Sequence, residues 1–148
     1  MINESYISPS AQLRFEVVSD FNIVVIEQQD MKRAGIAEYL HFIGLVGDVL
    51  KFKQTGKILF DIRKMTNYDL MSRAAAIKEL NTLLFAKAPY FLLAVVKGNS
   101  LFENMATQAA ISAARPISKK FLGGKMFDSR EEAVIWLNEF SIPPEFKE

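Results

Sequence analysis

The sequence predicts an α/β fold with one mixed, mostly parallel sheet. Two observations lead to this prediction. First, two β-branched-rich runs at 13–18 and 22–28 are separated by only three residues, which favours a hairpin. Second, strand-like apolar runs then alternate with stretches of helical periodicity to the end of the chain. The resulting order is β-β-α-β-α-β-α-β-α, in which crossover connections make the later strands parallel.

Each expected element has its own signal. The first run alternates apolar and polar residues, which is typical of a strand with one buried face, whereas the second run is continuously apolar, as in a central strand. The later strands are short apolar runs, and the helices show apolar residues at helical spacing or are rich in Ala and Leu. We expect helices at 31–52, about 70–87, 100–115 and 128–140, and strands at 57–62, 91–96 and 119–127.

Capping residues indicate where two of the helices begin. Asp30 is placed to cap the helix at 31–52, and Ser129 and Glu132 have capping-box spacing before the last helix. Glycines weaken the first helix by roughly 1 kcal/mol each relative to alanine, and they mark a kink or a close backbone approach. These glycines are Gly35, Gly44 and Gly47.

Both ends of the chain are expected to lie outside the domain. Residues 1–12 are polar, with Pro9 between serines, and we interpret them as a loose lead-in without the apolar stretch of a secretory signal. Residues 141–148 are interpreted as a tail. A single domain is therefore expected at 13–140.

Composition argues against several classes of function. The chain has 18 basic and 17 acidic residues, so it lacks the excess of Lys and Arg that nucleic-acid binding requires. There is no cysteine, and His41 is the only histidine, which leaves few residues for a metal site or a catalytic triad. No apolar run approaches the ~20 residues that span a membrane. We expect a cytoplasmic protein with no cofactor, no metal, no nucleic-acid partner and no membrane insertion.

Asp61 raises the question of a phosphoacceptor, because a buried strand ending in aspartate is how bacterial receiver domains present theirs. Glu27 and Asp30 could imitate the acidic pair that holds the required cation in a receiver. However, only one crossover separates the strand that ends near Glu27 from the strand that ends at Asp61, so the acceptor would lie on the wrong strand. The late Lys-Pro signature of receiver domains is also missing. We interpret Asp61 as a strand-end carboxylate that accepts hydrogen bonds from the following loop or pairs with Arg63 or Lys64.

Three stretches, together with the element order, resemble the STAS or SpoIIAA-like family, in the branch that merges with SEC14-type domains. They are KILFDIRKMT, FLLAVVKGNSLFENMA and KMFDSREEAVIWLNE. The last is the most telling, because it joins a strand ending in Phe, an Asp-Ser cap, Glu-Glu-Ala and Trp-Leu. The resemblance covers about residues 13–140. It implies helices packed mainly on one face of the sheet, and a non-enzymatic regulatory domain that binds a protein partner or a second copy of itself.

In phosphoserine-switched members of this family, an Asp-Ser-Ser-Gly-like turn follows the middle strand, and phosphate there changes the charge of the partner-binding surface by nearly two units. Asp69 matches the aspartate, but Leu70 and Met71 replace the serines and Ser72 replaces the glycine. The switch residue is therefore unmatched, although Ser72 or Thr66 could substitute for it. The partner-binding surface that the resemblance implies consists of Asp61, Met65, Thr66, Asp69, Met71 and Ser72.

The many small residues at 104–114 leave two interpretations open, namely close packing and an apolar cavity between helices and sheet. Methionine would give such a cavity adaptable walls. The alternative function is therefore a carrier or sensor of a small apolar, lipid-like ligand. No nucleophile–base pair is visible, so an enzyme is not expected. Possible lining residues are Phe42, Met65, Met71, Phe102 and Met105.

Overall fold

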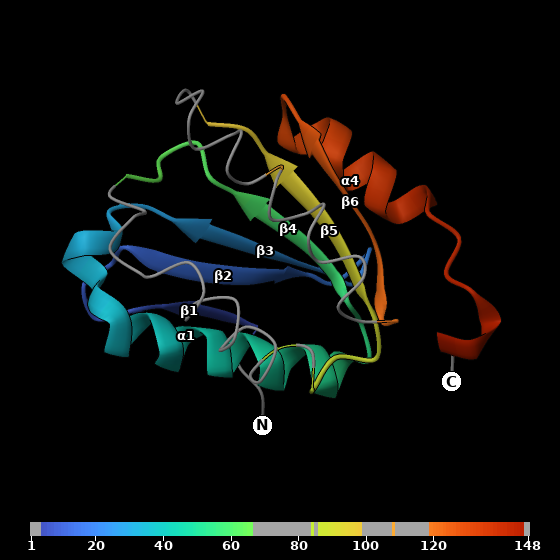
Figure 1. Cartoon of the computed structure of the whole chain (residues 1–148), viewed down its shortest axis with the longest axis horizontal. Helices are drawn as coiled ribbons and strands as arrows, with labels where there is room; N and C mark the ends of the chain where they lie inside the picture. Colours follow the sequence, from blue (N-terminus) through green and yellow to red (C-terminus); the bar gives the residue numbers. More distant parts are fainter. Residues whose placement is uncertain (1–3, 67–83, 85, 99–107, 109–118, 147–148) are drawn as a thin grey trace.

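The computed structural model describes residues 4–66, 84, 86–98, 108 and 119–146. These residues form a six-stranded sheet whose strands lie side by side in chain order. Two α-helices and a short C-terminal 3-10 helix accompany the sheet (Figure 1). The strands are β1 (Ser5–Ile7), β2 (Leu13–Val18), β3 (Ile23–Gln28), β4 (Lys57–Asp61), β5 (Phe91–Val96) and β6 (Phe121–Phe127), and the helices are α1 (Met31–Lys53), α4 (Arg130–Glu139) and η3 (Pro144–Phe146).

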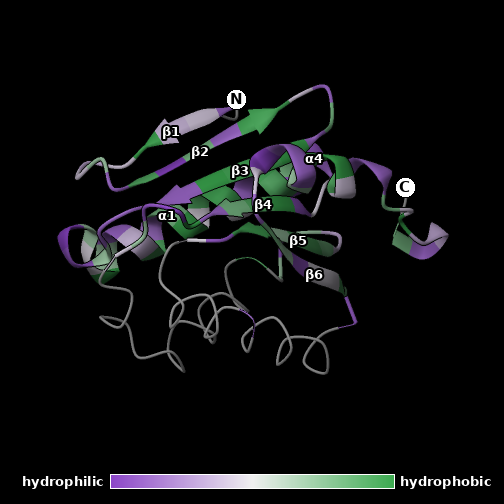
Figure 2. Ribbon diagram, turned by 90° about the horizontal axis from the view of Figure 1, so that it is seen from above, coloured by the Kyte–Doolittle hydropathy of each residue, from purple (hydrophilic) through white to green (hydrophobic). Residues whose placement is uncertain are grey.

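The sheet is mixed, as the sequence predicts. β1, β2 and β3 pair antiparallel, with β2 and β3 forming the expected hairpin. From β3 onward the pairing is parallel through β4, β5 and β6. The parallel part buries both faces, so β3 and β5 are almost continuously apolar. In Figure 2 the middle strands are mostly green, whereas polar segments recur along β2.

The two described helices lie on opposite faces of the sheet (Figure 1). One core joins α1 to the side chains of Phe15, Ile26 and Ile58, and the other joins α4 to those of Val25 and Leu59. The expectation that helices lie mainly on one face therefore does not describe α1 and α4. The helices expected near 70–87 and 100–115 fall almost entirely outside the described residues.

α1 begins and bends where its sequence predicts. The Asp30 side chain accepts hydrogen bonds from the N–H groups of Lys32 and Arg33, which confirms the cap. Gly35 has φ 75° and ψ 166°, so the helical path is interrupted after its first turn. This conformation is essentially restricted to glycine. The kink interpretation is thus correct at Gly35, whereas Gly44 has no positive φ.

The N-terminal residues are more ordered than a loose lead-in. β1 lies within 1–12 and pairs with β2, and the Ser10 N–H donates to Glu38 of α1 at 3.2 Å. A three-residue strand has too few positions for a period-2 pattern, so no local signal in the sequence predicts it. At the other end, the expected tail contains η3, and the Phe146 ring lies 6.5 Å from that of Tyr90.

Candidate functional site

The candidate site is built around Asp61, the last residue of β4. Its carboxylate is on the face that α4 covers, and the side chain is only 3% exposed. Glu27 is its register neighbour on β3. Two carboxylates thus lie side by side at the carboxyl ends of parallel strands, where open α/β sheets commonly place functional groups.

Both oxygens of Asp61 accept hydrogen bonds from Arg63. The Arg63 backbone N–H and Nε donate to Oδ1 at 3.1 and 2.9 Å, and Nη2 donates to Oδ2 at 2.6 Å. Burial of the Asp61 carboxyl raises its pKa, but the hydrogen bonds from Arg63 and Arg130 outweigh burial and lower the pKa to about 2. The pairing with Arg63 that the sequence predicts is therefore present. A carboxylate held this firmly in its ionised form is a poor general base.

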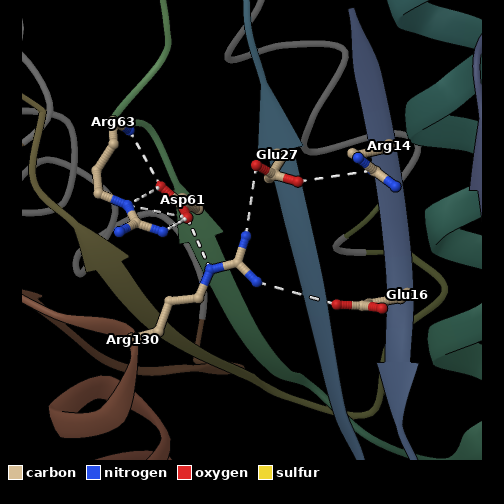
Figure 3. Close-up of polar contacts among 6 residues, drawn as sticks. All are labelled: Arg14, Glu16, Glu27, Asp61, Arg63 and Arg130. Carbon is tan, nitrogen blue, oxygen red and sulfur yellow. Dashed lines mark hydrogen bonds and ion pairs between the residues drawn. The ribbon is translucent and has the colours of Figure 1, made fainter. Parts of the chain in front are cut away.

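Arg130 completes the site from the start of α4. Its Nε donates to Oδ2 of Asp61 at 2.7 Å, and its guanidinium continues across the sheet toward Glu27 at 3.5 Å and Glu16 at 3.9 Å (Figure 3). A cation in the first turn of a helix opposes the helix dipole by about 0.3–1 kcal/mol. The three carboxylates offset this cost and hold the N-terminus of α4 over β4.

A shallow polar hollow lies beside this network. It has a volume of about 200 Å³ and is lined by Arg14, Phe15, Glu16, Val25 and Glu27. Arg14 lies 3.6 Å from Glu27, so this ion pair, like the pair between Glu27 and Arg130, is looser than the contacts to Asp61. Asp61 and its two arginines form the closely bonded part of the site, and the hollow lies beside them.

The loop that follows β4 is anchored at both of its ends. Asp61 holds it through Arg63, and at its far end the Thr66 N–H donates to Gln29 O at 2.8 Å. The Met31 N–H in turn donates to Thr66 O at 3.0 Å, which fastens the loop to the start of α1. The side chains of Arg63, Lys64 and Thr66 are nevertheless exposed. The loop therefore presents polar side chains from a fixed backbone.

The residues of the expected partner-binding surface differ in their exposure to solvent. Thr66 is exposed, but Asp61 and Met65 are buried, and Met65 packs in the core on the α1 side of the sheet. A residue that is 6% exposed cannot contact a partner without rearrangement, so Met65 is a core residue in the free protein. Asp69, Met71 and Ser72 lie outside the described residues.

The expected ligand cavity finds no support from Phe42. This residue is fully buried, and its ring lies 5.8 Å from that of Phe15 and 6.3 Å from that of Tyr6. Neighbouring rings at these distances are in direct contact, so Phe42 is packed within the core on the α1 side. Met65, another proposed lining residue, is buried in the same core. The remaining proposed lining residues, Phe102, Met105 and Met71, lie outside the described residues.

Arg130 is the site residue that sequence reasoning did not identify. It lies 69 residues after Asp61, and within KMFDSREEAVIWLNE it looks like an ordinary polar residue of a helix N-terminus. The usable signal was topological. The helix after β6 begins at the carboxyl edge of the sheet, so its first turn approaches the ends of the neighbouring strands.

Comparisons with family models, with curated proteins and with solved structures found no match to this chain. Within the described ranges, no group of three or more His, Cys, Asp or Glu side chains could hold a metal ion. None of the helices in these ranges has the length and apolar character needed to cross a membrane.

Proposed function

We propose that this chain is a non-enzymatic interaction domain of the STAS type, which regulates another protein by binding it. The observation that carries the proposal is the loop of residues 63–66, whose backbone is anchored at both ends while its polar side chains remain exposed. A preorganised surface loses little conformational entropy on binding, which favours its use in recognition.

The chemistry of Asp61 supports binding over catalysis at this site. Its oxygens already accept hydrogen bonds from Arg63 and Arg130, and its lowered pKa keeps it ionised. Breaking these charge-assisted bonds to free the carboxylate would cost more than breaking neutral ones. Asp61 acts in this proposal as a positioning residue, which fixes the backbone of the exposed loop.

Two exposed cations, Arg63 and Lys64, dominate the loop, so the proposed partner presents acidic side chains to it. Arg63 remains half-exposed while it pairs with Asp61, so part of its guanidinium is free to meet a carboxylate. Lys64 offers a second positive charge that can be altered without disturbing Asp61. The surface therefore selects partners by charge and by the fixed path of the loop.

Site-specific photo-crosslinking in cells of the native organism tests the proposal. A photoreactive amino acid at position 66 should give one discrete protein adduct. The matched control is position 20, because Asp20 is also exposed but lies in the β2–β3 turn, at the opposite end of β3. Lys64→Glu, introduced beside the probe, should reduce the adduct several-fold. Absence of an adduct at position 66, or equal adducts at both positions, would overturn the proposal.

A further inference from the structure

The open edge of the sheet at β1 supports an inference that goes beyond the proposed function and does not depend on it. β1 is paired with β2 on one side only, and Figure 2 shows it along the margin of the sheet with no described element beyond it. Edge strands carry a row of unpaired backbone groups that can pair with another strand.

The hydrogen bonds to β2 fix which backbone groups of β1 face outward. The Val17 N–H donates to Glu4 O at 2.8 Å, and the Ser8 N–H donates to Leu13 O at 2.9 Å. Residues of an antiparallel strand alternate between bonding the neighbour and pointing away from it. The N–H and C=O groups of Ser5 and Ile7 must therefore point toward the open edge.

We propose that two copies of this chain associate through β1, which pairs antiparallel with β1 of the second copy about a two-fold axis near Tyr6. In this register Ser5 lies opposite Ile7 of the second copy, and Ile7 lies opposite its Ser5. Each opposed pair exchanges two backbone hydrogen bonds, so all four outward-facing N–H and C=O groups of each strand become paired. The two sheets join into one continuous sheet.

Side chains favour the same arrangement. Ile7 is 56% exposed, which is high for a large apolar side chain in a strand. It lies on the face of the sheet opposite Tyr6, whose ring stacks on Phe15 within the monomer. In the dimer the two Ile7 side chains become diagonal neighbours on one face, with Cα atoms about 7–8 Å apart, which allows them to shield each other from water.

The two edges of the sheet differ in charge and in the regularity of their pairing. β6 carries Gly123, Gly124 and Lys125, and its pairing with β5 contains a register shift. Charged residues and irregularities of this kind protect an edge from pairing. β1, with the sequence Ser-Tyr-Ile, has neither charge nor proline. In the two-fold register Glu4 lies opposite Ser8 of the second copy, so no like charges oppose one another.

Sedimentation equilibrium of the full chain tests this dimer, and proline substitutions make the test specific. Ser5→Pro and Ile7→Pro each remove an outward N–H that the monomer does not use, and proline is tolerated at such edge positions. Each should raise the dimer dissociation constant at least tenfold. Ser5→Ala keeps the N–H and should leave the constant within about twofold. Circular dichroism at low concentration establishes that each variant is folded.

The same dimer predicts a result for the unmodified protein. By NMR, amide hydrogen exchange at Ser5 and Ile7 should slow as protein concentration rises, whereas Tyr6, whose N–H faces β2, should be protected at every concentration. A protein that stays monomeric at millimolar concentration would overturn the inference, as would a dimer that survives both proline variants or is lost equally in Ser5→Ala. Concentration-independent exchange at Ser5 and Ile7 would also overturn it.

Discussion

Arg130 and Asp61 are 69 residues apart in the sequence, yet the Nε atom of Arg130 donates a 2.7 Å hydrogen bond to Oδ2 of Asp61. This bond links the first turn of α4 to the end of β4. Because Arg63 binds the same carboxylate, one buried side chain positions both a helix and the exposed loop that follows β4. The proposed binding surface therefore depends on Asp61 even though Asp61 itself is inaccessible.

Asp61→Asn is expected to lower the free energy of unfolding by about 2 kcal/mol, because it removes the charge that two guanidinium groups stabilise. Asp48→Asn is the matched control. Asp48 pairs with Lys87 at 2.6 Å, but its side chain is 50% exposed. A surface pair of this kind contributes at most about 0.5–1 kcal/mol. Urea denaturation near pH 7 measures both variants, and equal losses would contradict the central position given to Asp61.

The contribution of Asp61 should depend on pH with a defined sign. Its pKa in the folded protein is lowered from 3.8 to about 2, so the folded state binds this proton less readily than the unfolded state. The stabilisation is therefore complete above pH 5 and is lost as pH falls from about 5 to about 2. The difference in unfolding free energy between wild type and Asp61→Asn should shrink across this window. A difference that stays constant from pH 6 to pH 2.5 would contradict the ion-pair account.

Two glycines of α1 should respond in opposite directions to alanine. Gly35 has a positive φ that alanine adopts only with strain, so Gly35→Ala should destabilise the protein by about 1–3 kcal/mol. Gly44 lacks a positive φ, and a methyl group there would meet nothing within 4 Å. Gly44→Ala should therefore stabilise the helix by about 0.5–1 kcal/mol. Thermal unfolding followed by circular dichroism measures both changes. A Gly35→Ala variant that is as stable as the wild type, or more stable, would show that the kink does not require glycine.

Gln28 allows the free-energy cost of a buried, unpaired polar group to be measured. Its Nε2 atom is buried without a hydrogen-bond partner among the residues that the structure describes, and Gln28 is 4% exposed. A buried donor in this state costs about 1–3 kcal/mol. Gln28→Met keeps the length of the side chain and removes the donor, so it should raise the free energy of unfolding. Destabilisation by more than about 1 kcal/mol would show that the amide binds a partner group in solution.

The sequence predicted those features that depend on local patterns. Alternation in β2, the apolar run of β3 and the caps at Asp30 and Ser129 all appear where short-range rules place them. β5 spans Phe91–Val96, as expected. Each of these features arises from residues within a few positions of one another, so a short stretch of the sequence is enough to predict it.

Features that depend on long-range packing were missed. β1 is too short to show a period, and it exists because β2 offers it an edge. The burial of Met65 and the packing of Phe42 against Tyr6 depend on how α1 crosses the sheet, which no local pattern encodes. The same holds for Arg130, whose partners come from three strands.

Native mass spectrometry of gently purified protein, with a denatured control, distinguishes a protein-binding domain from a carrier of a small ligand. An interaction domain should give the mass of the chain alone, of two copies, or of the chain with a protein partner, and no added small molecule. A small-molecule mass that is present in the native spectrum and lost on denaturation would contradict the proposed function, because the chain would then be a carrier. A mass increase of one phosphoryl group that survives denaturation would show that a residue such as Ser72 or Thr66 takes the place of the unmatched switch serine.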